Sequence, residues 1–227
     1  MAVSEQLLAL HEKDPLSFAA VAAYLGQAFS AWGALKKIER FPGGYSNLTY
    51  LVQCEKKQVV LRRPPAGATI QTAHDMGRES RVLQALAPHF SPLPQVYVAE
   101  DDPHVLGAPF FLMEHLAGLV LRAGNAPGMN WPPERYAALS KTMVQTLARL
   151  HAIDLTATGL LSLGKPTGYV ARQVKGWTDR YLAAATDKIG SLDHVADWLN
   201  KNQPPAPAPA FLHNDFKYDN LILDPAQ

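Results

Sequence analysis

The chain changes character near residue 116, and this change limits the folds that it can adopt. Before that point, short apolar segments are separated by Gly, Pro and charged residues, which is typical of β-strands joined by turns. After it, apolar residues recur at helical spacing over longer segments. The sequence therefore predicts an α+β protein with a β-rich first lobe, residues 1–116, and a helical second lobe, residues 117–227. A cleft between two such lobes is a natural ligand site.

In the first lobe the predicted strands and helices are interspersed, whereas the second lobe is mainly helical. Residues 49–54 and 58–63 read as a hairpin around a charged turn. Trp177 and Trp198 are expected in the helical core. The other expected strands are 35–41, 95–101 and 109–116, with two short ones at 211–212 and 221–223, and the expected helices are 15–30, 74–87, 133–152, 168–186 and 191–202.

Composition excludes several classes of protein. Hydrophobic residues make up 48% and charged residues 18% of the chain, which argues against disorder. A formal net charge of +1 gives no field for nucleic acid or an acidic membrane surface. Cys54 is the single cysteine, so a disulfide framework is excluded and a reducing, cytoplasmic location is expected. No apolar segment reaches the roughly 18 residues of a membrane span, and the N-terminal residues do not have the pattern of a secretory signal.

A polar segment, HNDFKYDN at residues 213–220, lies between two apolar ones. Asp215 and Asn220 are five positions apart, so a loop can turn both toward one small volume. Phosphoryl transfer needs such a pair, because a carboxylate accepts the proton of the attacking hydroxyl and an oxygen donor holds Mg²⁺ beside it. The alternative is an ordinary turn, since turns are rich in Asn and Asp.

This segment resembles the HxDxxxxN loop of the aminoglycoside phosphotransferase and choline kinase family, which is related to the protein kinases. The resemblance implies that Asp215 is the catalytic base and that Asn220 is a Mg²⁺ ligand. It implies that His213 braces the loop through backbone hydrogen bonds and that Lys217 contacts phosphate, although a solvated Lys217 is the simpler reading. ATP and Mg²⁺ are the cofactors that follow from it.

Two segments of the first lobe are similar to the phosphate-binding part of the family. FPGGYSNLTYLV (41–52) resembles its first hairpin, in which backbone N–H groups of Gly43, Gly44, Tyr45 and Ser46 would cradle phosphate. VVLRR (59–63) resembles the strand that carries a phosphate-binding lysine. Arg62 stands at the lysine position, and arginine binds phosphate as a fork. The alternatives are a plain hairpin turn and, for Arg63, a solvated strand end.

Two further segments resemble the family's nucleotide pocket. In HDMGRESRVLQAL (74–86), Glu79 would pair with Arg62, as on the αC-type helix of a kinase; the alternative is an exposed glutamate. In PFFLMEHLAG (109–118), Met113 would lie at the back of the adenine pocket. Backbone groups from Glu114 to Leu116 would bond the adenine edge.

Taken together, the resemblance implies a protein kinase-like two-lobe fold with an incomplete helical second lobe. Within the family, the chain resembles bacterial phosphotransferase family proteins and kinase-like domains that precede acyl-CoA dehydrogenase domains. The second likeness suggests a hydroxy acid or a hydroxyacyl-CoA as the acceptor. Family members continue with a second metal carboxylate, whereas this sequence ends at Gln227, so we expect little or no turnover from it alone. The main alternative is a non-catalytic nucleotide-binding or interaction module. A metal-dependent hydrolase using His213 and Asp215 is a weaker one, and the oligomeric state stays open.

Overall fold

The computed structural model describes residues 7–10, 14–42, 47–65, 76–122, 131–206 and 208–224. The chain divides into two compact units. The first comprises residues 1–148 and 213–227, and the second comprises residues 149–212. The segment 213–227 thus groups with the first unit, and the division into lobes at residue 116 stays a prediction.

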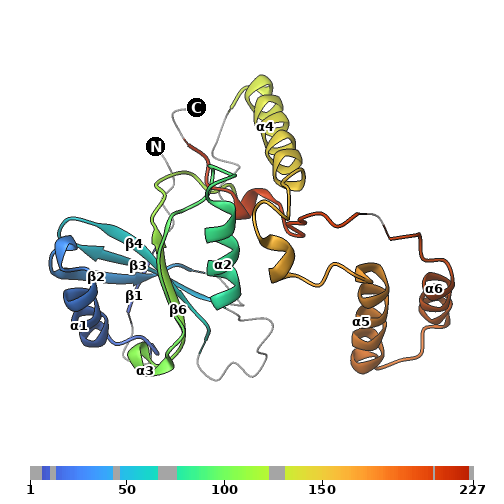
Figure 1. Cartoon of the computed structure of the whole chain (residues 1–227), viewed down its shortest axis with the longest axis horizontal. Coiled ribbons are helices and arrows are strands. Elements are labelled where there is room, and N and C mark those ends of the chain that lie inside the picture. Colours follow the sequence, from blue (N-terminus) through green and yellow to red (C-terminus); the bar gives the residue numbers. More distant parts are fainter. Residues whose placement is uncertain are drawn as a thin grey trace. The chain divides into compact units, whose positions relative to one another are not determined.

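The first unit is built on a six-stranded antiparallel sheet with the order β1-β2-β3-β4-β6-β5 (Figure 1). The predicted hairpin is confirmed as β3 and β4, which pair from Leu48 opposite Arg63 to Gln53 opposite Gln58. The strands are β1 (Leu8–Ala9), β2 (Leu35–Arg40), β3 (Leu48–Cys54), β4 (Gln58–Arg63), β5 (Val96–Glu100) and β6 (Phe110–Glu114).

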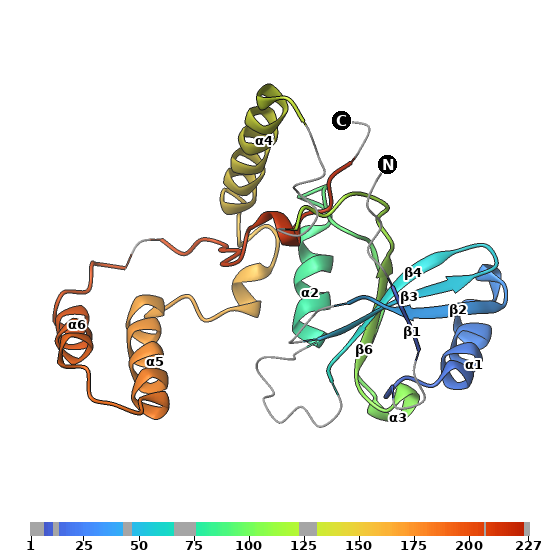
Figure 2. The same ribbon diagram turned by 180° about the vertical axis from the view of Figure 1, so that it is seen from behind.

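Helices cover both faces of this sheet (Figures 1 and 2). One face packs against α1 through buried residues such as Val21, Leu25, Tyr50 and Leu61; the other carries α2, which contacts β5 and β6. This division follows from the alternation of side chains along each strand. The helices of the unit are α1 (Phe18–Ala28), α2 (Met76–Leu86), α3 (Pro103–Leu106) and most of α4 (Pro133–His151), with short 3₁₀ turns at Ser30–Trp32 and Tyr218–Asn220.

The short helix α3 was not predicted. Asp102 caps it by accepting a 2.9 Å hydrogen bond from the His104 N–H, and Pro103 suits its first turn. Four residues are too few to show a helical period in the sequence. The longer helices were predicted to within a few residues at each end.

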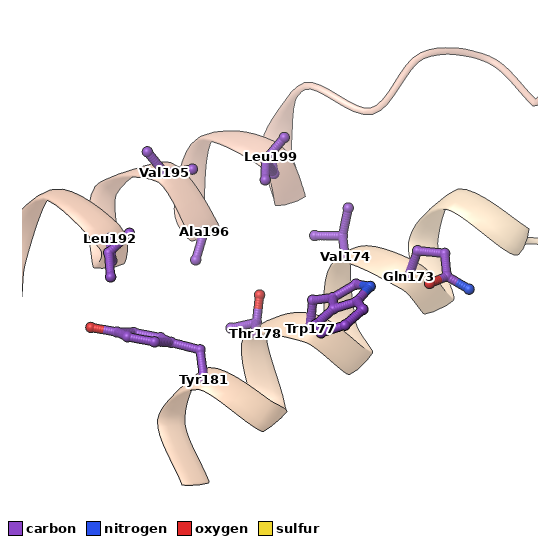
Figure 3. A pocket seen from close by; sticks show the side chains of 9 residues that line it. All are labelled: Gln173, Val174, Trp177, Thr178, Tyr181, Leu192, Val195, Ala196 and Leu199. Carbon is purple, nitrogen blue, oxygen red and sulfur yellow. The ribbon is translucent and has the colours of Figure 1, made fainter. Parts of the chain in front are cut away.

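The second unit contains α5 (Tyr169–Ala184), α6 (Gly190–Lys201) and a 3₁₀ turn at Leu160–Leu163. Trp177 and Trp198 are 64% and 61% exposed, so their predicted place in a core is wrong. The reason is that α5 and α6 pack mainly on each other and bury none of their own residues fully. Figure 3 shows the side chains that face across a pocket of about 300 Å³ between them, among them Val174, Trp177 and Tyr181 of α5 and Leu192, Val195 and Leu199 of α6.

The two strands predicted around the polar loop are also absent. Residues 211 and 212 form no strand, and Leu223 makes a single β-bridge with Leu119. The segment pairs at this one position only, because the chain enters it directly from the 3₁₀ turn at Tyr218–Asn220. Among the described helices, none combines the length and the apolar character that a membrane crossing requires.

Candidate functional site

The loop at 213–220 turns back on itself, so that its two predicted catalytic groups meet. The Asn220 side-chain amide donates hydrogen bonds to the Asp215 carboxylate at 2.8 Å and to the Asp215 backbone carbonyl at 2.9 Å. Asn214 makes the turn possible with a φ of 63°, a left-handed conformation that Asn adopts more readily than most residues. The Asp215 N–H donates to Nδ1 of His213 at 3.3 Å, which is the bracing contact expected of that histidine.

The charge of this loop is set by its own residues. The hydrogen bond from Asn220, followed by the positive charge of Lys217, lowers the pKa of Asp215. The Lys217 Nζ lies 3.4 Å from the Asp215 carboxylate, and both side chains are more than half exposed. Asp215 is therefore ionised at neutral pH and open to solvent, as a group that accepts a proton from an approaching hydroxyl must be.

The donor set of the loop suits a hard cation. Since both bonds from Asn220 use its amide nitrogen, its oxygen is available beside the Asp215 carboxylate. Mg²⁺ prefers oxygen ligands and is commonly held by one or two carboxylates together with substrate phosphates. Among the residues that the structure describes, no group of three or more His, Cys, Asp or Glu side chains is placed to hold a metal. The loop thus fits an ion that phosphate oxygens and water would also coordinate.

The loop is fixed to the rest of its unit at two places. The Tyr218 hydroxyl lies 3.1 Å from the Ser140 hydroxyl of α4. Beyond the loop, Leu119 and Leu223 exchange N–H to carbonyl hydrogen bonds of 2.9 and 2.8 Å. Sequence reasoning missed Gly118, next to this bridge, where an added Cβ would lie 2.4 Å from the Ile222 side chain. A glycine within a few residues of an apolar strand was the available signal.

The predicted pair of Arg62 and Glu79 is present. The Arg62 guanidinium donates to the Glu79 carboxylate, which joins β4 to α2. Burial raises the pKa of Glu79, and the Arg62 charge offsets this in part. The Nε of Arg62 is buried without a hydrogen-bond partner in the described part of the chain. The Arg62 side chain as a whole is 28% exposed, so an acceptor such as phosphate can still reach its guanidinium.

The linker after β6, residues 115–119, has backbone groups that can bond a ligand. The Glu114 N–H already donates to the Gln95 carbonyl at 2.8 Å, and the Glu114 carboxylate accepts from the Gln95 N–H at 3.2 Å. Across residues 115–117, in contrast, the backbone forms no hydrogen bond with any described residue. The Glu114 N–H is therefore taken, whereas the backbone donors and acceptors of His115 and Leu116 are open to an adenine edge. Burial lowers the pKa of the His115 imidazole and favours its neutral form.

Strand pairing connects the Arg62–Glu79 pair with β6, the linker and the catalytic loop. Arg62 of β4 lies opposite Phe111 of β6, and Val60 lies opposite Met113, which is half-buried. The linker continues β6 and carries Leu119, the residue bridged to the end of the catalytic loop. Gly43, Gly44, Tyr45 and Ser46 lie outside the described residues. Their roles, and those of the other predicted site residues, stay predictions.

Arg63 differs from its predicted place at a solvated strand end. It is 2% exposed and donates from Nη1 to the carbonyls of Pro15 and Leu106, at 3.1 and 2.9 Å. The prediction was wrong because neighbours in a strand face opposite sides. Arg62 faces α2, so Arg63 must face the core under α1 and α3.

A six-stranded antiparallel sheet with a kinase-type ion pair to its helix, followed by an HxDxxxxN loop, defines the protein kinase-like fold of phosphotransferases. A family model described as "Phosphotransferase enzyme family" matches residues 37–227. The chain therefore belongs to that family.

The curated relatives are much longer proteins. Acyl-CoA dehydrogenase family member 10 of Mus musculus is 38% identical over 186 residues, which cover 82% of this chain and 17% of that protein. Member 11 of Homo sapiens is 34% identical over 227 residues, which cover 98% of this chain and 28% of that protein. The chain thus spans less than a third of each of these relatives.

Solved structures share the fold. A crystal structure from Ralstonia eutropha JMP134, assigned as an aminoglycoside phosphotransferase, matches with a TM-score of 0.77 and 31% identity, over 93% of this chain and 62% of that one. A thermostable mutant of aminoglycoside phosphotransferase APH(4)-Ia, in a ternary complex with AMP-PNP and hygromycin B, matches with a TM-score of 0.61 and 15% identity, over 92% and 68%. The second likeness concerns the fold alone.

Proposed function

We propose that this chain carries the nucleotide-binding and catalytic-loop part of an ATP-dependent kinase, which moves the γ-phosphoryl group to a hydroxyl of a small metabolite. The observation that carries the proposal is the contact between Asn220 and Asp215, which sets an ionised base beside an amide oxygen in the HxDxxxxN arrangement. The AMP-PNP and hygromycin B bound by the APH(4)-Ia mutant support the same pairing of a nucleotide with a hydroxylated acceptor.

In this mechanism the chain's own residues bind and orient the nucleotide and the acceptor, and one of them takes up a proton. Backbone groups at His115 and Leu116 bond the adenine edge, and the Arg62 fork, held by Glu79, binds phosphate oxygens. Asp215 accepts a hydrogen bond from the acceptor hydroxyl and takes its proton as the new O–P bond forms and the bond to the ADP oxygen breaks. When bound, Mg²⁺ neutralises charge on the phosphates, and the Asn220 oxygen would help to hold it.

The proposed acceptor follows from the relatives of the chain. The acyl-CoA dehydrogenase relatives suggest a hydroxy acid or a hydroxyacyl-CoA, since a kinase segment in such a protein would act on a related carbon chain. A cytoplasmic location is proposed because Cys54 is buried and unpaired.

The second candidate is a nucleotide-binding module without turnover. It is favoured by Arg62, which stands at the position where the family resemblance places a phosphate-binding lysine. Such a module would be stabilised by nucleotide and would release no ADP beyond background.

The test is a transfer assay with Mg·ATP and a panel of short-chain hydroxy acids and their CoA thioesters, run beside nucleotide binding on this chain with the segment that follows the catalytic loop in family members restored. We expect Asp215→Asn to lower transfer by about 10²- to 10⁴-fold, because the proton acceptor is lost, and to leave nucleotide affinity within a few-fold. Asp219→Asn removes the same charge from the same loop and serves as the matched control. Binding without transfer favours the module, and transfer that Asp215→Asn leaves unchanged contradicts the kinase proposal.

A further inference from the structure

The linker after β6 and the segment after the catalytic loop cross in direct contact at Gly118. A Cβ added at Gly118 would lie 2.4 Å from Cγ2 of Ile222 and 2.6 Å from the Leu223 carbonyl oxygen. The side chain of Ile222 can turn aside, but the carbonyl is backbone and is fixed by its bond to Leu119. Only a residue without a side chain fits between these two segments as they lie.

On the side of the catalytic loop, backbone hydrogen bonds hold the crossing in place. The two hydrogen bonds between Leu119 and Leu223 make a reciprocal antiparallel pair, and Leu119 is 7% exposed. Asn220 stands three positions before Leu223, and its own N–H donates to the Lys217 carbonyl at 3.0 Å. A shift of the Leu223 segment would therefore move Asn220, and with it the bonds from Asn220 to Asp215.

The crossing is equally close to the open backbone of the linker. Residues 115–117, which form no backbone hydrogen bond within the described residues, directly precede Gly118. A planar ligand edge that bonds them would fix the linker one residue away from the contact with Ile222 and Leu223. The two ends of the candidate site are thus joined through a few backbone atoms.

We propose that Gly118 is a positioning residue, which lets occupancy of the linker order the Asp215–Asn220 loop through the crossing with residues 222 and 223. The inference rests on the proposed function, because it takes the linker to be the purine-binding segment. The part of Gly118 is to transmit the position of the linker to the loop.

Adenosine is the probe that isolates this effect, since it has the purine edge but no phosphate to reach the loop. Amide hydrogen exchange is measured on the whole chain without ligand, with adenosine and with ADP. In the unaltered chain we expect adenosine to slow exchange both at residues 115–119 and at residues 220–223. In Gly118→Ala we expect exchange at Leu119 and Leu223 to be about tenfold faster without ligand, and adenosine to protect the linker alone.

Gly26→Ala is the matched control, because a Cβ at Gly26 in α1 meets no atom within 4 Å; it should behave as the unaltered chain. If adenosine protects the linker of the unaltered chain but not residues 220–223, the positioning role is overturned while the nucleotide site stands. If neither adenosine nor ADP protects the linker, both the proposed function and this inference are contradicted. Both outcomes are measured on the unaltered chain, so the test stands even if Gly118→Ala does not fold.

Discussion

Arg62 and Arg63 are neighbours in β4, and their side chains lie on opposite faces of the sheet. Arg62 faces α2 and reaches Glu79. Arg63 faces the core, where it bonds two carbonyls beside the pair formed by Asp14 and the Tyr50 hydroxyl at 2.6 Å. We propose that Arg62 is held for a ligand, whereas Arg63 ties the strand to the segment before α1 and to the last residue of α3.

Replacing Arg63 by methionine should destabilise the protein by about 2–4 kcal/mol, because the Pro15 and Leu106 carbonyls lose their donor inside the fold. Urea unfolding followed by circular dichroism measures the change. Lys141→Met removes an exposed positive charge from α4 and is the control. Equal stability of the two variants would mean that the buried guanidinium contributes nothing net.

At the scale of elements, α2 is joined to the sheet by a carboxylate that burial disfavours. A carboxyl whose pKa is raised on folding binds its proton more tightly in the folded state. The stability contributed by neutral Glu79 is therefore complete below the ordinary pKa of 4.5 and is lost as the pH rises through the raised value. The ion pair with Arg62 limits this loss without cancelling it.

We therefore expect the unaltered chain to lose stability relative to Glu79→Gln as the pH rises from about 4.5 toward neutrality. The difference should stay under about 1 kcal/mol, because the pair is partly exposed. Free energies of unfolding for both proteins at a series of pH values supply the test. Glu134→Gln in the first turn of α4 should run parallel to the unaltered chain. A gain in stability of the unaltered chain over Glu79→Gln across this range would reverse the assignment.

The elements that could be predicted are those with a period, a cap or a turn signal. The β3–β4 hairpin and the helices α1, α2, α4, α5 and α6 follow from such signals. The pairing of Arg62 with Glu79 followed from the family resemblance instead. The helix α3 was too short to show a period. The burial of Arg63 and the exposure of Trp177 depend on which elements cover a face, and a single sequence does not state that.

At the scale of the whole molecule, family membership and local geometry agree. The matched region, residues 37–227, includes every predicted site residue. The contacts described above run from the Arg62–Glu79 pair through β4 and β6 to the linker, and from the linker through Leu119 to the catalytic loop. The central claim is that this connected set of groups binds a purine nucleotide.

Calorimetric titration of the chain with ADP in the presence of Mg²⁺ tests that claim most directly. We predict saturable binding at micromolar concentration, weakened about tenfold or more by Arg62→Met, because the guanidinium supplies charge-assisted hydrogen bonds to phosphate. Lys141→Met should bind as the unaltered chain does. The absence of binding at millimolar ADP, or an equal affinity for Arg62→Met and Lys141→Met, would contradict the account.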